Sequence, residues 1–495
     1  MIEMTLREIA DVVGGELHDV PDPQALVTGS VEFDSRRIGS GDLFLALPGA
    51  NSDGHDYAAA AVAAGAVAVL AARPVGVPAI VVAPDLGSVP ASSVALSADG
   101  DGSGAAVLAA LAELARVSTE RLAERTGLTV VGVTGSSGKT STKDLLAAVL
   151  APLGAVVAPP GSFNNELGHP WTALRAGPDT KFLALELSAR GRGHIAELAR
   201  IAPPRIGVVL NVGTAHLGEF GSREAIAQAK GELVEALPAE GLAVLNADDP
   251  NVSAMASRTK ARVVKVGLSG DADIRATDVI TDDQARARFI LHVAGESIPI
   301  QLAVHGEHQV GNALAAAAVA LECGADLATV AEALSGATAA SVRRMDVTTT
   351  PAGVTVINDS YNANPDSVRA ALKALVTLAK PANRRSWAVL GEMGELGDTS
   401  VIEHDAIGRL AVRLDVDRLI VIGTGRPSHG MHQGAVMEGS WGEESILVPD
   451  IDAAIALLDD EIAAGDVVLV KASKAVGLWA VAEHLTGAAE GNTAR

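Results

Sequence analysis

A glycine-rich turn followed by lysine and threonine is the part of the sequence that points most directly to chemistry. The apolar run Val130–Thr134 leads into Gly135-Ser136-Ser137-Gly138, and Lys139-Thr140-Ser141 then opens a stretch that favours a helix. Backbone N–H groups in such a turn bind phosphate oxygens, the lysine reaches the outer phosphates, and the hydroxyl reaches Mg²⁺. Val133 stands where the common pattern has its first glycine, so the loop is a shortened variant. Because strand, turn and helix follow in the required order, we predict a nucleoside triphosphate site rather than an ordinary surface turn.

Two polar residues near the ends of apolar runs are candidate metal ligands. Glu186 lies within an apolar run, where it could hold Mg²⁺ through its oxygens or pair with Arg190 or Arg192. His216 follows the next apolar run and could be a metal ligand or a capping residue. Ligands of open α/β sheets gather beyond the carboxyl ends of the strands, so a phosphate loop on a neighbouring strand favours the metal interpretation of both residues.

Other polar segments leave two interpretations open. Lys230 lies in a predicted helix, where a lysine is usually a solvated side chain. Three segments are unusually dense in Asn, Asp, Gly, His and Pro, namely 161–170, 305–312 and 358–367. These residue types favour turns by themselves, so each segment is either turn chemistry or part of a site.

The composition limits the partners of the protein. Its 495 residues carry 60 acidic and 38 basic side chains, a formal net charge of −22, and such a surface repels nucleic acids and anionic membranes. The single Cys323 lies in an alanine-rich stretch, where we expect it to be buried, and it favours a reducing compartment.

The N-terminus lacks a signal pattern, and the apolar run 57–72 is shorter than the roughly 20 residues of a membrane span. We expect a cytoplasmic protein without membrane insertion.

The alternation of apolar runs and helical stretches predicts an α/β fold with three domains. Residues 1–98 form a small N-terminal α/β domain with a helix near 57–64, and a linker-like stretch, 88–104, follows its strands. Residues 99–336 form a central P-loop-type domain with a mostly parallel sheet, and residues 337–495 form a Rossmann-like doubly wound domain without a G-x-G-x-x-G turn after its first strand. The expected strands are 26–33, 43–47, 67–70 and 79–82 in the first domain, 130–134, 182–187, 206–211, 242–246 and 263–267 in the second, and 354–359, 387–391, 418–423 and 467–471 in the third.

Taken together, these motifs resemble the ATP-dependent Mur ligases of bacterial cell-wall synthesis. The features that follow that family's pattern are the shortened phosphate loop, Glu186, the turn 211–216, the segment Ala229-Lys230-Gly231-Glu232, and Asn312 before an alanine-rich helix. Further segments are similar to the member that adds D-alanyl-D-alanine, namely 34–36, 41–47, 53–56, 163–170 and above all Asn358–Pro365. The resemblance covers almost the whole chain.

The resemblance implies an ATP- and Mg²⁺-dependent ligase that joins D-Ala-D-Ala to the terminal carboxylate of UDP-MurNAc-tripeptide through an acyl phosphate, acting as a monomer. It also reverses the interpretation of Lys230, because the family carbamylates the matching lysine into a metal ligand. The implied ATP contacts are Gly135–Ser141, Asn312 at adenine, Arg344 at a phosphate and Asp359 at the ribose. The implied metal ligands are Thr140, Glu186, His216 and carbamylated Lys230, and the implied catalytic residues are Lys139, Glu186, His216 and Lys230. The implied contacts of the other substrates are Ser30, Asp34, Ser35, Arg36, Asn164, Asn165, Tyr361 and Asn362.

The sequence also departs from the family's pattern. Lys471-Ala-Ser-Lys474 stands where relatives often have Lys-Gly-Ser-Arg, and Arg343 stands where a glycine is common, which leaves open whether Arg343 or Arg344 faces ATP. His404 and Asp405 are candidate bases for the dipeptide amine, although a helix surface is the expected place for them. Two rival functions are another amide ligase of the same superfamily and a P-loop NTPase switch, which would hydrolyse ATP without a carboxylate substrate.

Overall fold

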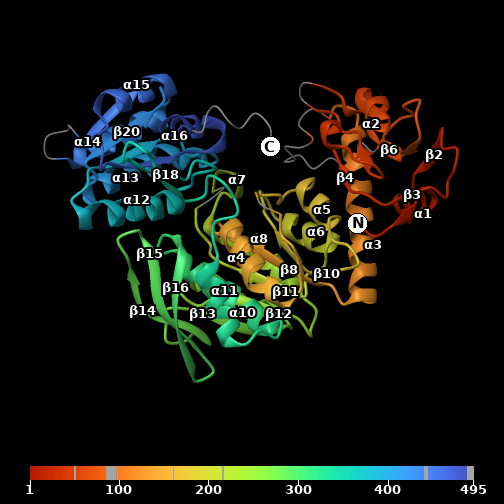
Figure 1. The fold of residues 1–495 in the computed structure, drawn as a ribbon, viewed down its shortest axis with the longest axis horizontal. Helices are drawn as coiled ribbons and strands as arrows, with labels where there is room; N and C mark the ends of the chain where they lie inside the picture. Colours follow the sequence, from red (N-terminus) through yellow and green to blue (C-terminus); the bar gives the residue numbers. More distant parts are fainter. Residues whose placement is uncertain are drawn as a thin grey trace.

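Three lobes with separate sheets make up the molecule, which is the mixed α/β, three-domain arrangement predicted from the sequence (Figure 1). The structure, a computed structural model, describes residues 1–49, 52–84, 96, 99–159, 161–214, 217–439 and 444–487. Within these residues no helix is both long enough and apolar enough to cross a membrane.

The N-terminal lobe has a small sheet of strand order β2-β7-β6-β5-β4, in which β4 to β7 run parallel. Its elements are β1 (Met4–Thr5), α1 (Leu6–Val13), β2 (Glu16–His18), β3 (Leu26–Val27), β4 (Val31–Glu32), β5 (Leu43–Leu45), α2 (Ala58–Ala64), β6 (Ala68–Ala71) and β7 (Ala79–Val81). The expected single strand 26–33 is wrong. It splits because β3 pairs with β1 whereas β4 pairs with β5, and between them Gly29 packs where a Cβ would lie 2.2 Å from Asp42 Oδ1.

The central lobe is built on the sheet β16-β15-β14-β13-β12-β11-β8-β10-β9, which is parallel from β14 to β9. Its strands are β8 (Thr129–Thr134), β9 (Ala155–Val157), β10 (Thr180–Glu186), β11 (Ile206–Val209), β12 (Leu242–Asn246), β13 (Arg262–Gly267), β14 (Ile274–Thr281), β15 (Arg286–Val293) and β16 (Glu296–His305). Its helices are α3 (Ser103–Thr126), α4 (Lys139–Leu150), α5 (Gly168–Ala173), α6 (His194–Ile201), α7 (Leu217–Phe220), α8 (Arg223–Glu235), α9 (Pro250–Ser253), α10 (Gln309–Glu322) and α11 (Leu327–Gly336).

The strands β14, β15 and β16 at the edge of this sheet, which pair antiparallel with one another, were not expected from the sequence. β15 turns into β16 through Ala294 and Gly295, which both have positive φ angles, 49° and 89°. Such a tight turn is usually marked by Asn-Gly or Asp-Gly, so Ala-Gly gave no signal. The predicted parallel strands of the central sheet are confirmed in position, and all except the half-buried β13 consist mainly of buried residues, which explains their continuous apolar runs.

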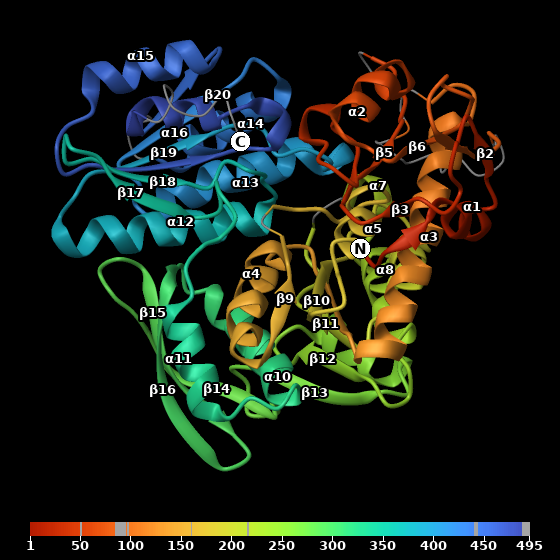
Figure 2. The ribbon, with the colours of Figure 1, turned by 45° about the vertical axis from the view of Figure 1, so that its right-hand side comes forward.

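Helices cover both faces of the central sheet, and the strand before the phosphate loop lies between β10 and β11. On one face the alternate β8 residues Val131 and Val133 share a core with α4, α10 and α11. On the other face Val130 belongs to a second core shared with α3, α5, α6 and α8. That core continues into the N-terminal lobe through α3, which contacts α1 as well as α5 and α6 (Figure 2). Cys323, expected to be buried, is half-buried at the end of α10.

The C-terminal lobe is a doubly wound sheet of order β17-β18-β22-β19-β20-β21, with only its edge strand β17 antiparallel among the described residues. Its strands are β17 (Asp346–Thr349), β18 (Thr355–Asn358), β19 (Ser386–Leu390), β20 (Arg418–Ile422), β21 (Ser445–Val448) and β22 (Val467–Lys471). Its helices are α12 (Pro365–Ala379), α13 (Ser400–Arg413), α14 (Arg426–Glu438), α15 (Ile451–Glu461) and α16 (Trp479–Thr486). Helices α12 to α14 share one core with this sheet and helices α15 and α16 share the other.

Candidate active site

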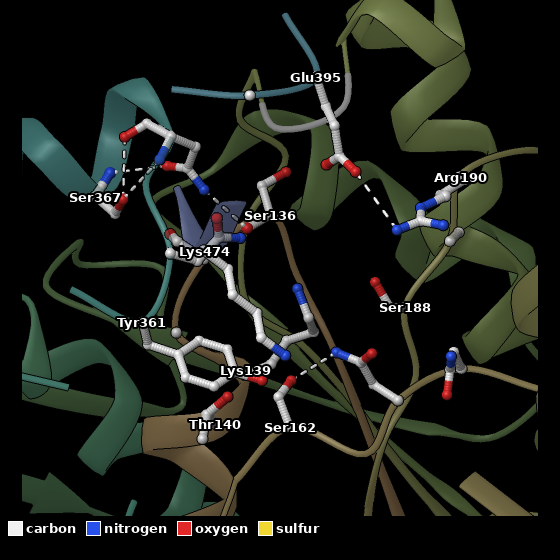
Figure 3. Close-up of a pocket in the computed structure, with 18 of the residues that line it drawn as sticks. Ser136, Lys139, Thr140, Ser162, Ser188, Arg190, Tyr361, Ser367, Glu395 and Lys474 are labelled. Carbon is white, nitrogen blue, oxygen red and sulfur yellow. Dashed lines mark hydrogen bonds and ion pairs between the residues drawn. The ribbon is translucent and has the colours of Figure 1, made fainter. Parts of the chain in front are cut away.

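A cavity of about 1160 Å³ lies between the central and C-terminal lobes and extends along α3 and α6. Its walls come from the phosphate loop 136–141, the segment 162–166, the segment 188–201, the start of α10, and the C-terminal segments 344–367 and 471–479. Figure 3 shows Ser136, Lys139 and Thr140 facing Tyr361 and Lys474 across it. Carboxyl ends of strands from both large sheets therefore open into one space.

Asn211, two residues after β11, holds the phosphate loop in shape. Its Oδ1 accepts hydrogen bonds from the backbone N–H groups of Ser136 (2.9 Å) and Ser137 (3.0 Å), and its Nδ2 donates to Ser137 O at 3.2 Å. Gly138 has a φ of 84° and lies against Asn312, because a Cβ there would be 2.7 Å from Asn312 Oδ1. The loop therefore needs glycine at 138 for both its conformation and its contact with α10.

Lys139 is folded back onto its own loop. Its Nζ donates to Gly135 O at 2.6 Å, and burial lowers the pKa of its ammonium to about 8, against the attraction of the Glu186 carboxylate. An anion bound in the loop would raise this pKa again, because opposite charge favours the protonated lysine. The site is therefore electrostatically suited to phosphate.

Glu186 ends β10 as a buried carboxylate that is 2% exposed. Its Oε2 accepts from Ser162 Oγ at 2.9 Å and from Asn164 Nδ2 at 3.4 Å, whereas its Oε1 is buried without a hydrogen-bond partner among the described residues. Arg190 pairs instead with Glu395 at 3.5 Å, so the sequence alternative of a Glu186–Arg190 pair is wrong. Burying a carboxylate oxygen without a hydrogen-bond partner is unfavourable, and coordination to a cation would satisfy it.

Lys230 is not a solvated side chain: it is 5% exposed, and burial, together with the nearby Lys139 ammonium, lowers its pKa well below the usual value. Thr140, the first hydroxyl after Lys139, is also buried. His216 lies outside the described residues. In the described part of the chain, no group of three or more His, Cys, Asp or Glu side chains is arranged to hold a metal ion.

The structure separates the two neighbouring arginines that the sequence left unresolved. Arg344 lines the cavity, with its guanidinium 4.1 Å from the centre of the Tyr361 ring. Arg343 faces α16, where it pairs with Glu483 at 2.6 Å and stacks over Trp479. Arg343 has a φ of 60°, in the left-handed region that favours glycine, which explains why glycine would suit this position.

Asp359 lies in the same wall and is held by a buried lysine. Lys471 Nζ lies 2.6 Å from Asp359 Oδ2 and donates to Asn362 O at 2.8 Å, and Asp359 Oδ1 accepts from Met345 N at 3.2 Å. Lys471 and Lys474 both line the cavity. The segment Lys471-Ala-Ser-Lys474, although it differs from the Lys-Gly-Ser-Arg of many relatives, therefore still provides two basic side chains to the site. Asn362 and Asn165 also line it.

The candidate substrate residues of the N-terminal lobe are grouped together but do not line this cavity. Asp34 caps the 3₁₀ turn Ser35–Arg37 and forms a two-point ion pair with Arg36, which lowers the pKa of Asp34 to about 2. The backbone N–H of Ser30 donates to Asp42 Oδ1 at 2.5 Å.

An aromatic contact joins this region to the central lobe. Trp171 of α5 is buried between Phe33, whose ring centre is 5.7 Å away, and Phe163, at 4.7 Å. Arg175 covers the Trp171 ring at 4.0 Å and pairs with Glu32 at 3.2 Å. Phe163 adjoins Ser162 and Asn164, which contact Glu186, so one continuous set of contacts runs from β4 to the phosphate site.

The candidate bases are placed elsewhere. His404 is buried rather than on a helix surface, and its Nε2 accepts from Met393 N at 2.8 Å while its Nδ1 bonds Ser400 O at 2.6 Å. Asp405 pairs with Arg409 at 2.8 Å. Neither residue lines the cavity, and both ring nitrogens of His404 are engaged by backbone.

Three residues of the site had no such role assigned from the sequence, although their segments were singled out: Asn211 as the clamp of the loop, Lys471 as the partner of Asp359, and His308 as a cavity residue. Asn211 follows an apolar strand that neighbours the strand before the phosphate loop. This position in the sequence could have indicated that its side chain contacts the loop. Burial lowers the pKa of His308, which favours its neutral form.

Family comparisons cover most of the chain. Residues 29–115 match the model "Mur ligase family, catalytic domain", residues 133–320 match "Mur ligase middle domain", and residues 343–474 match "Mur ligase, glutamate ligase domain".

Similar proteins and structures span the whole length. The chain is 61% identical to the UDP-N-acetylmuramoyl-tripeptide–D-alanyl-D-alanine ligase of Mycobacterium tuberculosis strain H37Rv, over 98% of each chain, and 31% identical to that of Escherichia coli K12, over 98% of this chain and 99% of the relative. A crystal structure of MurF from Acinetobacter baumannii superposes with a TM-score of 0.81 at 29% identity, covering 98% and 99% of the two chains. MurF of Thermotoga maritima in complex with ADP gives a TM-score of 0.73 at 28% identity, covering 93% and 98%.

Proposed function

The chain belongs to the Mur ligase family and is an ATP-dependent, amide-forming ligase, and from this premise we propose how its residues carry out the reaction. It joins D-alanyl-D-alanine to UDP-MurNAc-tripeptide in the synthesis of peptidoglycan precursors. The observation that carries the assignment of residues is that the phosphate loop, the buried Glu186 region and the C-terminal segment 344–367 meet at one cavity.

ATP occupies the part of the cavity beside α4 and α10. The loop 135–141 binds the phosphates through its backbone N–H groups and Lys139. Asn312 contacts adenine, Arg344 a phosphate, and Asp359 the ribose. In support, Asn312 touches Gly138 of the loop, and Arg344 and Asp359 line the same wall.

Mg²⁺ fits the donors beside the loop, because the unpartnered Oε1 of Glu186 and the hydroxyl of Thr140 are hard oxygen ligands. His216 and carbamylated Lys230 complete the proposed ligand set. The burial of Lys230 favours its neutral amine, which is the form that adds to CO₂ to give a carbamate and a proton. Bound Mg²⁺ would neutralise charge on the phosphates during transfer.

The remaining substrates occupy the two ends of the site. Ser30, Asp34, Ser35 and Arg36 bind the uridine diphosphate end in the N-terminal lobe. Asn164 and Asn165 border the tripeptide, and Tyr361 and Asn362 border the dipeptide. Four of these, Asn164, Asn165, Tyr361 and Asn362, line the cavity beside the phosphate loop, which supports their assignment to the substrates that react there.

The reaction runs in two steps. The tripeptide carboxylate attacks the γ-phosphorus of ATP in line, the bond to the bridging oxygen breaks, and ADP leaves with an acyl phosphate formed. Lys139 and the loop N–H groups stabilise the charge on the phosphoryl oxygens. The neutral amine of D-Ala-D-Ala then attacks the acyl carbon, phosphate leaves, and the amine gives up a proton. The C-terminal lobe forms one wall of the cavity, where it limits the access of water.

We propose the domain division 1–98, 99–336 and 337–495, and a monomer acting in the cytoplasm. The contact of each large sheet with its own helices supports the second boundary. The net charge of −22 supports the absence of nucleic-acid partners.

Phosphate release tests the function. It is measured with ATP and Mg²⁺, adding UDP-MurNAc-tripeptide and D-Ala-D-Ala singly and then together. We expect rapid turnover only with both substrates, and a UDP-MurNAc-pentapeptide product by mass. Equal release with neither substrate would indicate an NTPase switch instead, and release with a different amino acid would indicate another ligase of the superfamily.

A further inference from the structure

The first turn of α12 contacts the central lobe beside the phosphate loop, and the reaction described above does not use this contact. Asp366 Oδ2 accepts a hydrogen bond from the backbone N–H of Thr214 at 3.2 Å. Two residues earlier, Asn364 Nδ2 donates to Ser136 O at 3.4 Å. In Figure 3 Ser367 and Ser136 lie on facing elements at this point. The C-terminal lobe therefore bonds both the phosphate loop and the turn after β11.

Glycines make this approach possible. A Cβ on Gly213 would lie 2.0 Å from Asp366 Oδ2, so no larger residue at 213 is compatible with the docked carboxylate. Further along, Gly218 N donates to Glu395 O at 3.2 Å, and a Cβ on Gly218 would lie 2.5 Å from Gly397 N. We refer to residues 213, 214 and 218 with 364–366 and 395–397 as the seam.

Asp366 is held ready for this bond from within its own lobe. Arg369 Nη1 lies 3.1 Å from Asp366 Oδ1, and Arg369 Nη2 lies 2.9 Å from Glu403 Oε2. Because Oδ1 is engaged by Arg369, Oδ2 is the oxygen that meets Thr214 across the seam. The side chain thus has one partner in each lobe.

We infer that Asp366 is a positioning residue that couples docking of the C-terminal lobe to the geometry of the ATP site. Thr214 lies three residues after Asn211, the clamp of the phosphate loop, and the Gly213 N–H between them donates to Ser136 Oγ at 2.9 Å. Fixing this turn therefore fixes the loop. Only the docked lobe provides the bond, so the ATP site is complete when the dipeptide-binding lobe is in place. The inference rests on the proposed function.

The coupling matters because the acyl phosphate reacts with water. If the lobe does not dock, water attacks the acyl phosphate in place of the amine, phosphate leaves, and the tripeptide carboxylate is regenerated. ATP is then hydrolysed to ADP and phosphate without an amide. A seam that fails should therefore lower the amount of amide formed per phosphate released, which a general loss of folding would not do.

The test compares amide and phosphate produced by the full-length enzyme with all substrates. For Asp366→Ala we expect kcat to fall by about tenfold, the KM of ATP to rise because the turn that fixes the phosphate loop is released, and the ratio of amide to phosphate to drop from one to below about one half. Asp366→Asn keeps an oxygen that accepts the Thr214 N–H and should restore most of the ratio. Glu403→Gln, which alters only the outer partner of Arg369, is the matched control and should keep a ratio of one.

Gly213→Ala tests the same contact from the other side. Its Cβ would displace the carboxylate and lower the ratio, and adding Asp366→Ala, which removes the clashing oxygen, should cause little further loss. A ratio of one with near-normal kcat in Asp366→Ala would overturn the inference, as would strictly additive losses in the double variant. The wild-type enzyme is assayed first. If it makes no amide from these substrates, the proposed function itself is overturned, independently of the variants.

Discussion

Lys471, at the end of β22, and Asp359, just after β18, form a buried ion pair in which Nζ and Oδ2 are 2.6 Å apart. The lysine side chain is only 2% exposed, and its ammonium also bonds the backbone oxygen of Asn362. The pair therefore ties the end of a central strand to the segment 358–367 that forms the cavity wall. It also shows how the sequence Lys471-Ala-Ser-Lys474 contributes to the site despite its departure from the family's pattern.

Removal of this lysine should destabilise the C-terminal lobe. We expect Lys471→Met to cost about 3–5 kcal/mol, because it leaves the Asp359 charge buried without its partner. Adding Asp359→Asn removes that charge and should recover part of the loss. Urea unfolding of the two variants checks this expectation, and an Asp359→Asn change that worsens the loss would contradict it.

The two arginines at 343 and 344 should behave differently. Arg344→Ala is expected to raise the KM of ATP by at least about tenfold, since one charge-assisted hydrogen bond is worth about 1.5–3 kcal/mol. Arg343→Ala removes only the contacts with Glu483 and Trp479 and should leave that KM nearly unchanged. Steady-state kinetics with varied ATP distinguish them, and equal effects would refute the assignment of Arg344.

Nucleotide binding should take up a proton at alkaline pH. Burial lowers the pKa of Lys139 to about 8, and bound phosphates raise it, so above pH 8 the complex holds a proton that the free enzyme lacks. Affinity should therefore fall as the pH rises through 8. Calorimetry of non-hydrolysable ATP binding at pH 8.5, in buffers of different ionisation enthalpy, measures the uptake.

Lys139→Arg is the control for this measurement. Arginine stays charged throughout the range, so the uptake that depends on Lys139 should disappear. An unchanged uptake in this variant would assign the proton to another group, such as Lys230.

Lys230 should carry a carbamate. With ¹³C-labelled bicarbonate we expect a protein-bound carbamate carbon signal in NMR that is absent from Lys230→Gln. The kcat of the same variant should fall by at least about a hundredfold, because the variant lacks one of the proposed Mg²⁺ ligands. Removal of dissolved CO₂ should lower the activity of the wild type and its return should restore it, whereas insensitivity to CO₂ would contradict the proposal.

The sequence was informative where chemistry and strand position coincide. The phosphate loop and Glu186 were found because each follows or ends a buried apolar strand, and parallel strands bring their carboxyl ends to one edge. Lys230 was recognised only through the family, because a buried lysine on a helix has the same local pattern as an exposed one.

What could not be predicted depends on contacts between distant parts of the chain. The direction of Arg343 and Arg344 follows from the positive φ of Arg343, and the Asp366–Thr214 bond joins residues 152 positions apart. The strands β14 to β16 were missed because they alternate buried and exposed residues and so lack the continuous apolar runs that marked the other strands, and because their Ala-Gly turn lacks the usual hairpin signal.

The aromatic contact around Trp171 gives the molecule a built-in optical reporter. Indole emission responds to a nearby charge and to the entry of water, and Trp171 is buried between Phe33 of one lobe and Phe163 of the next, under the Arg175 guanidinium. Trp479 lines the cavity, whereas Trp387 is buried in the C-terminal core away from both places. Arrival of the uridine-linked substrate and arrival of the nucleotide should therefore give separable changes in emission, so the order of binding can be followed in real time without any attached dye.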